Sequence, residues 1–505
     1  MSATQYLVAL GIIALGFIAL RPRRHLPLPP GPPADPIVAH LRYIPSKNQG
    51  AVFHQWSQTY GDVVSIRALG RTMIILDSVS AATDLLEKRS GNYSDRPIFP
   101  LYEIMDLKPN IALMSYGKEF RKHRRILHSN FTRDASRQWR GIQTSMARKL
   151  VQSLLAKPED YSRLISWFTT ALTLKIAYGL NIVSEDDEYI KIAEDMGHIM
   201  NNSGSPGGTP VDVFPFLQYL PSWFPGTYYA EVARKARPVI RKLYDLPLKK
   251  VQEDLANGLA APSLAASELT RLMKDGQISD EDMTDIKGAS MVIFAAGAET
   301  TWSTMLIFLL NIISHPEVQK RAQDEIDRVV GRNRLPNFDD YDSLPYLECV
   351  VQEVLRWHPI APLGVPHRCM EDDIYRDMFI PKGAMVIANL RGMSWDENVY
   401  ANPTKFDPMR FLPKPEGAGE PFFDSVFGFG RRICPGRHVA YNSLWIVIAT
   451  LFATSNISKA LDKEGREIDF VPEYQSGVVN RPKEFPCRIQ SRDDDSLTLL
   501  SEGAD

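Results

Sequence analysis

Apolar residues recur at helical spacing along most of the chain and alternate with polar residues in only a few short stretches. Two long apolar segments, 282–314 and 439–452, are typical of buried helices. Two stretches near the N-terminus, 62–67 and 72–77, read as strands joined by a turn, and 385–389 reads as a third strand. The pattern predicts a mainly α-helical fold with a small β-sheet formed near the N-terminus.

The chain begins with an apolar stretch that is followed at once by basic residues. Residues 6–20 are uncharged and almost wholly apolar, and three arginines lie between positions 21 and 24. A secretory signal peptide has the opposite charge order, so we expect a transmembrane signal anchor over residues 1–20 that leaves the rest of the protein in the cytosol. Residues 21–36 predict a basic stop and a proline-rich hinge, which is stiff because it favours the polyproline II conformation.

No linker divides the chain between positions 40 and 490, so we expect one large body over residues 37–490. Residues 491–505 are acidic and predict a disordered tail. The net charge is only −2, which argues against general nucleic-acid binding. The four cysteines show no paired spacing, which indicates a reducing compartment and neither a disulfide framework nor a zinc cluster.

Two further features bear on the relation of this body to the membrane. Asn-x-Ser/Thr sites occur at Asn92, Asn130, Asn201 and Asn456. Because we expect the body to stay on the cytosolic side, none of them should carry a glycan. Residues 214–224 are rich in aromatic side chains, and they form either a packed surface loop or a segment that dips into the bilayer beside a substrate entrance.

Cys434 lies in the decapeptide Phe-Gly-Phe-Gly-Arg-Arg-Ile-Cys-Pro-Gly, residues 427–436. Gly430 and Gly436 allow the backbone to turn tightly and to approach a flat group closely. Pro435 suits the first position of the helix that follows. We therefore expect Cys434 at a helix N-terminus, where the dipole and the free N–H groups lower the pKa of a thiol. A lone cysteine is more often a small buried hydrophobic residue, but this pattern extends well beyond the cysteine.

The pattern Phe-x-x-Gly-x-Arg-x-Cys-x-Gly resembles the haem-binding loop of the cytochrome P450 superfamily, the haem-thiolate monooxygenases. Its fixed positions here are Phe427, Gly430, Arg432, Cys434 and Gly436. The resemblance spans roughly residues 27–488 and implies that Cys434 is the axial thiolate ligand of haem b iron, which favours cleavage of the O–O bond. The order of anchor, basic stop and proline hinge resembles microsomal members, and the overall sequence resembles fungal members of secondary metabolism.

The longer apolar helix carries the sequence Ala-Gly-Ala-Glu-Thr-Thr at its centre. At helical spacing, one face contains Val292, Ala295, Ala296, Glu299 and Thr300. A lone helical threonine usually donates to the carbonyl four residues back, but a carboxyl group in an apolar helix needs a reason. The segment resembles the oxygen-activation motif of the family, which implies that Thr300 acts on bound oxygen and that Glu299 relays protons.

Glu353 and Arg356 are three residues apart on a further predicted helix with many apolar residues. Such pairs are usually solvated surface bridges of small worth. The family has the same Glu-x-x-Arg and a downstream Pro-x-Arg-Phe, which in this chain contains Arg410. The resemblance implies that Glu353, Arg356 and Arg410 form a cluster that braces the cysteine loop through bidentate guanidinium–carboxylate contacts.

Haem carries two propionate groups, which need cationic partners, and the resemblance implies Arg432 and Arg124 for this role. The family pattern before Arg124 contains a tryptophan, but this chain has Phe120 there. Phenylalanine lacks the indole N–H donor, which puts one propionate contact in doubt. His367 matches a third propionate contact, although a lone histidine is more often structural.

The substrate pocket is expected to be apolar. Its predicted linings are Val292, Ala295, Ala296, Ala361, Val365 and Val478, with a contribution from the loop around residues 99–114. This set favours a lipophilic substrate, such as a terpenoid or a polyketide.

No flavin or dinucleotide motif occurs in the chain, so electrons must come from outside. Basic residues flank the segments expected to contact haem: Arg121, Lys122, Arg125, Arg437 and His438. Such a cluster is usually a solvated face, but it can also dock an acidic partner. The resemblance implies that this partner is a membrane-bound NADPH-dependent cytochrome P450 reductase.

We therefore expect a single-pass protein of the endoplasmic reticulum membrane whose cytosolic domain inserts one oxygen atom of O₂ into a lipophilic substrate. One alternative is a haem-thiolate isomerase or dehydratase that does not use O₂, against which the intact Glu299-Thr300 pair argues. A second is a non-catalytic haem carrier or sensor, which needs neither this pair nor a reductase face. A third, in which Cys434 is a plain nucleophile or a zinc ligand, lacks partners in the sequence.

Overall fold

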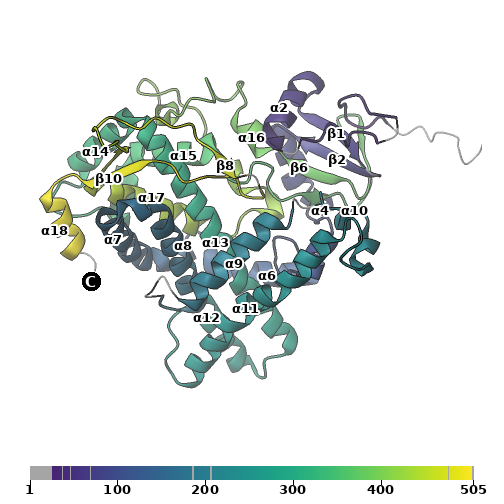
Figure 1. Ribbon diagram of the computed structural model, residues 1–505, viewed down its shortest axis with the longest axis horizontal. Coiled ribbons are helices and arrows are strands. Elements are labelled where there is room, and N and C mark those ends of the chain that lie inside the picture. Colours follow the sequence, from purple (N-terminus) through teal and green to yellow (C-terminus); the bar gives the residue numbers. More distant parts are fainter. Residues whose placement is uncertain are drawn as a thin grey trace, which may run out of the picture.

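Strands near the N-terminus pair with strands from the C-terminal half to form the largest sheet of the structure. The computed structural model places β1 (Val63–Ala68) antiparallel to β2 (Arg71–Leu76), and β2 parallel to β6 (Met385–Ala388). The short β3 (His367–Arg368) completes the order β1-β2-β6-β3. This sheet lies with α2 (Gln49–Tyr60) at one end of the molecule (Figure 1). Each of the three predicted strands agrees with the structure to within one residue at either end.

Other strands in the described part of the chain form pairs that the sequence pattern did not predict. These pairs are β4 (Asp373–Tyr375) with β5 (Met378–Ile380), β7 (Ser455–Lys459) with β10 (Cys487–Ser491), and β8 (Tyr474–Gln475) with β9 (Arg481–Pro482). Most of them have only two or three residues, which is too short to show an alternation of apolar and polar positions.

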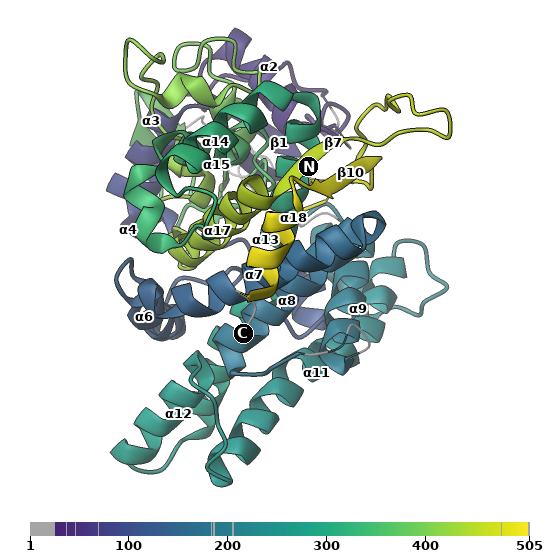
Figure 2. The same ribbon diagram turned by 90° about the vertical axis from the view of Figure 1, so that its left-hand side faces the viewer.

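Helices make up most of the regular structure, as predicted. The longer ones are α6 (Lys118–Phe131), α7 (Arg140–Ala156), α8 (Tyr161–Tyr178), α9 (Glu188–Asn202), α11 (Tyr228–Ala256), α12 (Leu264–Asp275), α13 (Asp280–Ser314), α14 (Pro316–Val329), α15 (Pro345–Trp357) and α17 (Arg437–Thr454). The shorter ones are α3 (Val79–Ala82), α4 (Ser90–Tyr93), α5 (Pro100–Ile104), α10 (Pro210–Val213), α16 (Leu390–Ser394) and α18 (Asp494–Glu502). Figure 2 shows α6, α8, α9, α11 and α12 on one side of the molecule, and α14, α15 and α17 with the sheet on the other.

The helix α13 passes between these two sides and forms the centre of the fold. Ser279 caps its N-terminus, because the Ser279 hydroxyl accepts a hydrogen bond from the N–H of Asp282. The helix packs along α8 at Gly297, where a Cβ atom would lie only 2.8 Å from Cγ2 of Thr173. It is long and apolar enough to cross a membrane, but 61% of its most apolar stretch is buried inside the protein. We therefore assign α13 to the core.

The structure describes residues 26–502, with the exception of 37, 46, 69, 183, 185–186, 205–206 and 476. The predicted anchor and the arginines that follow it lie outside the described residues. The proline-rich hinge is described, and it packs on the sheet. The N–H of Ser65 in β1 donates to the carbonyl oxygen of Pro30 at 2.9 Å, and a Cβ atom on Gly31 would clash with the Ser65 carbonyl.

The prediction of a disordered tail from residue 491 is wrong for the described residues. Ser491 ends β10, and α18 follows. The Oδ1 atom of Asp493 accepts hydrogen bonds from the N–H and the hydroxyl of Ser496 at 2.8 and 2.7 Å, which satisfies the start of the helix. Leu500 is buried, and α18 packs against α7 and α17. The acidic composition predicted disorder, but the segment forms a helix because distant parts of the chain, α7 and α17, pack against it.

Candidate active site

Cys434 lies in a loop that a backbone hydrogen bond closes. The N–H of Cys434 donates to the carbonyl oxygen of Phe427 at 2.8 Å, and α17 begins only at Arg437, with Gly436 as the N-cap residue. Cys434 therefore precedes the helix, and Pro435 is not its first residue, contrary to the prediction. The N–H groups of Gly436 and Arg437 nevertheless act on the thiol and favour its ionised form.

The Cys434 thiol is half-buried, and burial raises its pKa above the ordinary value. The N–H groups of Gly436 and Arg437 lower the pKa, as do the charges of Arg124 and Arg437, but they do not outweigh burial. The predicted net lowering is thus wrong for the protein alone, because the lost hydration of the thiolate is the larger effect. A metal cation changes this balance, since a coordinating thiol is deprotonated outright.

Two glycines of the loop differ in what they meet. Gly430 has a φ of +51°, and a Cβ atom there would clash with the carbonyl oxygen of Leu86, which lies in a π-helical segment, Thr83–Lys88. Glycine is therefore required at position 430 by both conformation and contact. Gly436 has a φ of −86°, and a Cβ atom there would meet no described atom within 4 Å. Contacts within the protein therefore explain why position 430 is a glycine, but they do not explain the glycine at position 436.

Three guanidinium groups gather beside the loop: that of Arg96 is buried, and those of Arg124 and Arg432 are half-buried. Burial lowers the pKa of each, and the pKa of Arg432 falls to about 10. Arg432 further lowers the pKa of Arg96, and Arg124 that of Arg432, so the three charges act on one another. Their hydrogen bonds go to backbone carbonyl oxygens, those of Ala112, Val365, Pro366, Ile433, Ser94, Ile111 and Met114. Apart from the charge of Asp95, which acts on Arg96 and Arg432, neutral oxygens hold these cations, and this favours an anionic ligand with carboxylate groups.

Arg96 is a member of this cluster that the sequence did not reveal. Its Nη1 atom donates to the carbonyl oxygens of Val365 and Pro366 at 2.6 and 2.9 Å, across 269 and 270 residues of sequence. The local sequence around Arg96 has neither helical nor strand periodicity. Only the fold brings this side chain to Arg432.

His367 lies in the same cluster, as a neutral group. Its Nδ1 atom is 2.7 Å from the carbonyl oxygen of Tyr93, to which it donates. Burial and the charges of Arg96 and Arg432 hold the pKa of His367 well below its ordinary value. In this neutral tautomer Nε2 is an acceptor and has no proton to give to a carboxylate.

The predicted face of α13 is only partly covered by protein. Ala296 is exposed, and Ala295, Glu299 and Thr300 are half-exposed, although the helix lies in the core. Val292, in contrast, is buried in the main hydrophobic cluster. The hydroxyl of Thr300 donates to the carbonyl oxygen of Ala296 at 2.8 Å, the bond that a helical threonine ordinarily makes.

Glu299 has a charged partner that the sequence did not reveal. The Nη1 atom of Arg481, in β9, donates to its Oε1 atom at 2.9 Å. Burial raises the pKa of Glu299, and the charge of Arg481 lowers it. The two residues are 182 positions apart, so no local pattern connects them.

The structure brings Glu353, Arg356 and Arg410 into contact in the interior. Arg356 donates from Nε and Nη2 to the two carboxylate oxygens of Glu353 at 2.7 and 2.8 Å, and Arg410 donates from Nε to Oε1 at 3.2 Å. Arg356 and Arg410 also bind the carbonyl oxygens of Ser394, Pro403, Ala401 and Lys405. The cluster therefore holds residues 394–410, the segment upstream of the cysteine loop.

The other predicted pocket residues lie on two segments. Ala361 and Val365 are half-buried between α15 and β3, and Val478 is exposed in the turn between β8 and β9. The Arg96 contact with the Val365 carbonyl connects the first segment to the guanidinium cluster.

The structure removes one residue, Lys122, from the predicted basic face beside the cysteine loop. Arg121 and Arg125 are exposed on α6. Lys122, in contrast, forms ion pairs with Glu281 at 2.6 Å and with Asp285 at 3.2 Å, so carboxylates of α13 offset its charge.

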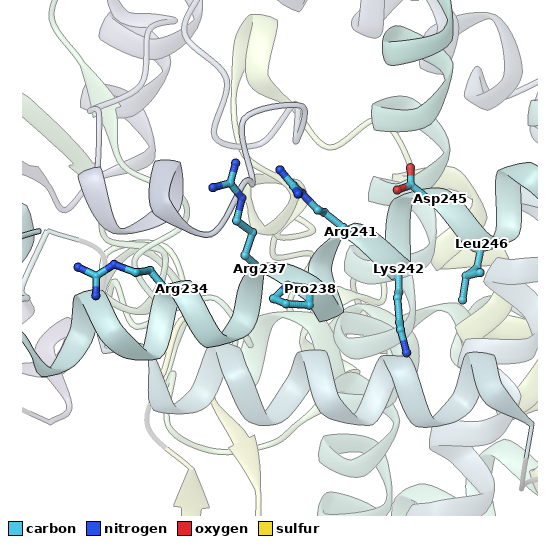
Figure 3. A pocket seen from close by; sticks show the side chains of 7 residues that line it. All are labelled: Arg234, Arg237, Pro238, Arg241, Lys242, Asp245 and Leu246. Carbon is cyan, nitrogen blue, oxygen red and sulfur yellow. The ribbon is translucent and has the colours of Figure 1, made fainter. Parts of the chain in front are cut away.

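A surface pocket of about 470 Å³ lies away from these groups, along α11 (Figure 3). Its lining residues are Arg234, Arg237, Pro238, Arg241, Lys242, Asp245 and Leu246. Arg237 and Arg241 extend to the same side of the helix, and both donate to Oδ2 of Asp106 at 3.2 and 2.8 Å. The pocket contains none of the predicted site residues.

Fold and site together define a mainly helical protein in which the half-buried Cys434 thiol lies beside a cluster of guanidinium groups. The Cys434 sulfur is a suitable iron ligand, and the three guanidinium groups suit two propionates. Known proteins resemble the chain over almost its whole length, and the family model for cytochrome P450 matches residues 29–485.

Among curated proteins, cytochrome P450 monooxygenase 136 of Postia placenta is 38% identical over 484 residues, which cover 95% of this chain and 92% of that protein. Cytochrome P450 monooxygenase 176 of the same fungus is 36% identical over 510 residues, 99% and 98% of the two chains. Tryptamine 4-monooxygenase of Psilocybe cyanescens is 35% identical over 482 residues, 94% and 95% of the two chains. The chain belongs to the cytochrome P450 family, and it is a monooxygenase.

Proposed function

We propose that the protein is a haem-thiolate monooxygenase that transfers one oxygen atom of O₂ to a lipophilic substrate in fungal secondary metabolism. The family relation supports haem b as the cofactor and NADPH as the source of electrons, through a separate reductase. A terpenoid or polyketide substrate is supported by the apolar residues predicted to line the pocket. One relative is named tryptamine 4-monooxygenase, so aromatic amines form a second class to test.

The Cys434 loop with its neighbouring guanidinium cluster carries this proposal. Cys434 would hold the iron through its sulfur, and the N–H groups of Gly436 and Arg437 would stabilise the thiolate. Arg96, Arg124 and Arg432 would hold the propionates. When bound, haem with a thiolate ligand supplies the chemistry that cleaves the O–O bond.

Glu299 and Thr300 would move protons on α13. Burial raises the pKa of Glu299, so this carboxyl group is more often protonated near neutral pH than an exposed one and can act as an acid. The Thr300 hydroxyl donates to the Ala296 carbonyl, and its free lone pair can accept a proton from the side of Glu299. To pass a proton onward, the Thr300 hydroxyl has to turn away from that carbonyl.

The basic residues around the cysteine loop would dock the reductase. Arg121 and Arg125 offer exposed charge on α6, while Arg437 and His438 begin α17 directly after the loop. Because Lys122 is already paired with carboxylates, we leave it out of this surface.

The aromatic segment supports contact with a membrane. Five of its large side chains are exposed, Phe214, Phe216, Tyr219, Trp223 and Phe224, with Tyr219 and Trp223 at 82% and 79%. A packed surface loop would cover such rings, so the exposure favours a segment that dips into the bilayer. With the proposed anchor, this exposure supports a catalytic domain on the cytosolic surface of the endoplasmic reticulum.

The absorbance spectrum of the reduced protein with carbon monoxide tests the cofactor and its ligand. We expect the red-shifted Soret band of a thiolate-bound haem, and its absence in the native protein would overturn the proposal. Spectral shifts on addition of terpenoids, polyketides and aromatic amines then identify the substrate class. An isomerase or dehydratase would convert its substrate without O₂, and a haem carrier would show no turnover with NADPH and reductase.

A further inference from the structure

The guanidinium of Arg481 is held on three sides, one of which is Glu299. Besides the 2.9 Å bond from Nη1 to Oε1 of Glu299, its Nη2 atom donates to Oε1 of Gln475 at 3.1 Å. Its central carbon lies 3.7 Å from the centre of the Trp302 ring, in the geometry of a cation–π contact. Trp302 follows Glu299 by three residues on α13, so helix and guanidinium meet at two neighbouring side chains.

The hairpin of β8 and β9 directs Arg481 toward α13. Gln475 and Arg481 are opposite each other in the antiparallel register, and β9 packs on α13. The N–H of Asn480, the preceding residue, donates to the carbonyl oxygen of Ile360 at 2.6 Å, which ties the hairpin to the end of α15. The backbone that carries Arg481 is therefore fixed at both its strands and its turn.

Burial separates this ion pair from the surface pairs of the same hairpin. The side chain of Arg481 is 13% exposed and that of Glu299 is 33% exposed. Lys483 and Glu473, two register positions further along the hairpin, are 54% and 70% exposed. Exposed pairs contribute little because water screens them, whereas a half-buried pair that also stacks on a ring restricts the carboxylate to one position.

Burial and the charge of the partner shift the pKa of Glu299 in opposite directions, and the same holds for the pKa of Arg481. Burial raises the pKa of Glu299 and lowers that of Arg481, and each residue's charge opposes the effect of burial on the other. In the described part of the chain, Arg481 is the charged group that acts on Glu299, and Glu299 and Glu484 are those that act on Arg481. No hydrogen bond to Oε2 of Glu299 occurs among the described residues.

We propose that Arg481 is a positioning residue for proton delivery: it holds Oε1 of Glu299 and leaves Oε2 as the oxygen that exchanges protons. This inference rests on the proposed role of Glu299 as the proton-relaying acid. The same hairpin carries Val478, three residues before Arg481, at the predicted substrate pocket. The hairpin therefore carries both a predicted pocket residue and the charged partner of Glu299.

Infrared titration of the full-length holoenzyme tests the contact without turnover. The band of the protonated Glu299 carboxyl is identified as the carbonyl absorption that is lost in Glu299→Gln. Since the charge of Arg481 lowers the pKa of Glu299, we expect this band to form at a higher pH in Arg481→Gln than in the wild type. Arg481→Lys keeps the charge and should restore most of the shift. An unchanged titration in Arg481→Gln would overturn the proposal.

Lys483→Gln is the matched control, because it removes an ion pair from the same hairpin without touching Glu299. We expect it to leave the Glu299 band unchanged. Thermal unfolding and the carbon monoxide spectrum are recorded for every variant, so that loss of fold or haem is distinguished from loss of positioning. If Arg481→Gln does not fold, Arg481→Met takes its place: a Glu299 band that forms at a higher pH than in the wild type supports the contact, and an unchanged band contradicts it.

Turnover with NADPH and reductase, using the panel compound with the largest spectral shift, gives the second readout. We expect Arg481→Gln to divert consumed NADPH from product to hydrogen peroxide by several-fold, with the apparent KM of the compound within twofold of the wild type. A parallel fall of product and NADPH use would indicate a structural role only. Absence of the thiolate band in the wild type would defeat the proposed function, while the infrared result would still decide the Arg481 contact.

Discussion

The guanidinium carbon of Arg432 lies 3.7 Å from the centre of the Phe120 ring. Phe120 stands where the family pattern has a tryptophan, and the ring is almost fully buried. Three guanidinium nitrogens of Arg432 already donate to carbonyl oxygens, so the ring adds attraction rather than another acceptor. The chain thus keeps an aromatic face under Arg432 and gives up the indole N–H.

Replacing Phe120 by Leu should weaken haem retention. A partly desolvated cation–π contact contributes about 1–2 kcal/mol, so we expect haem transfer to apomyoglobin to be about 5- to 30-fold faster. Phe131→Leu is the control, since Phe131 is buried near the end of the same helix and has no cation over its ring in the described structure. Equal transfer rates in the two variants would show that the Arg432 contact does not hold the site together.

The two loop glycines should respond differently to alanine. Gly430→Ala forces a Cβ atom into the Leu86 carbonyl at a left-handed φ, so we expect loss of several kcal/mol of stability and little folded protein. Gly436→Ala meets no such contact and should leave the unfolding temperature of the haem-free protein unchanged. If haem approaches the backbone at Gly436, the same variant should lower the haem content of the purified protein. Full haem content in Gly436→Ala would remove Gly436 from the predicted cofactor contacts.

Glu353→Ala should abolish haem incorporation rather than only slow turnover. It leaves the buried guanidinium group of Arg356 without a carboxylate and leaves Arg410 with Glu420 only, and breaking a buried pair in this way costs about 3–5 kcal/mol. The ratio of haem to protein absorbance measures the effect. Asp160→Ala removes an ion pair of similar spacing at the surface and should change little. A folded and fully haem-loaded Glu353→Ala protein would contradict the proposed brace.

Trp223 should contact lipid in the full-length protein. In vesicles that contain brominated phospholipids, we expect quenching of tryptophan fluorescence that is largely lost in Trp223→Phe, because Trp223 is 79% exposed. Trp445→Phe is the control, since Trp445 is fully buried in the core. Identical quenching in the wild type and Trp223→Phe would mean that the aromatic segment stays out of the bilayer.

Glycosidase treatment of the full-length protein purified from a fungal expression host should leave its electrophoretic mobility unchanged. The proposed topology keeps Asn92, Asn130, Asn201 and Asn456 on the cytosolic side, where no glycan is added. The amide of Asn92 also donates to the carbonyl oxygen of Glu371 at 3.0 Å, a bond that a glycan would disturb. A secreted glycoprotein from the same cells serves as the positive control, and a shift of the native protein would place the body in the lumen.

Elements with a continuous periodic pattern were predictable from the sequence. The ranges expected for α13 and α17 differ from the structure by two residues at most, since each is an apolar segment of more than a dozen residues. Acidic composition misled the prediction at α18, where a capping Asp493 and a buried Leu500 decide the structure. Strands as short as β8 and β9 exist because their backbones find partners, which local sequence does not encode.

The sequence by itself determined the family, the candidate ligand Cys434 and the Glu353–Arg356 pair, because each rests on residue types within a few positions of one another. Only the tertiary structure decided the partners of Arg96 and Arg481, which contact residues 182 to 270 positions away. It also decided the protonation of the site: burial raises the pKa of the Cys434 thiol and keeps His367 neutral. Hydration and charge at an ionisable group depend on what surrounds it in space, and that packing is formed by the whole chain.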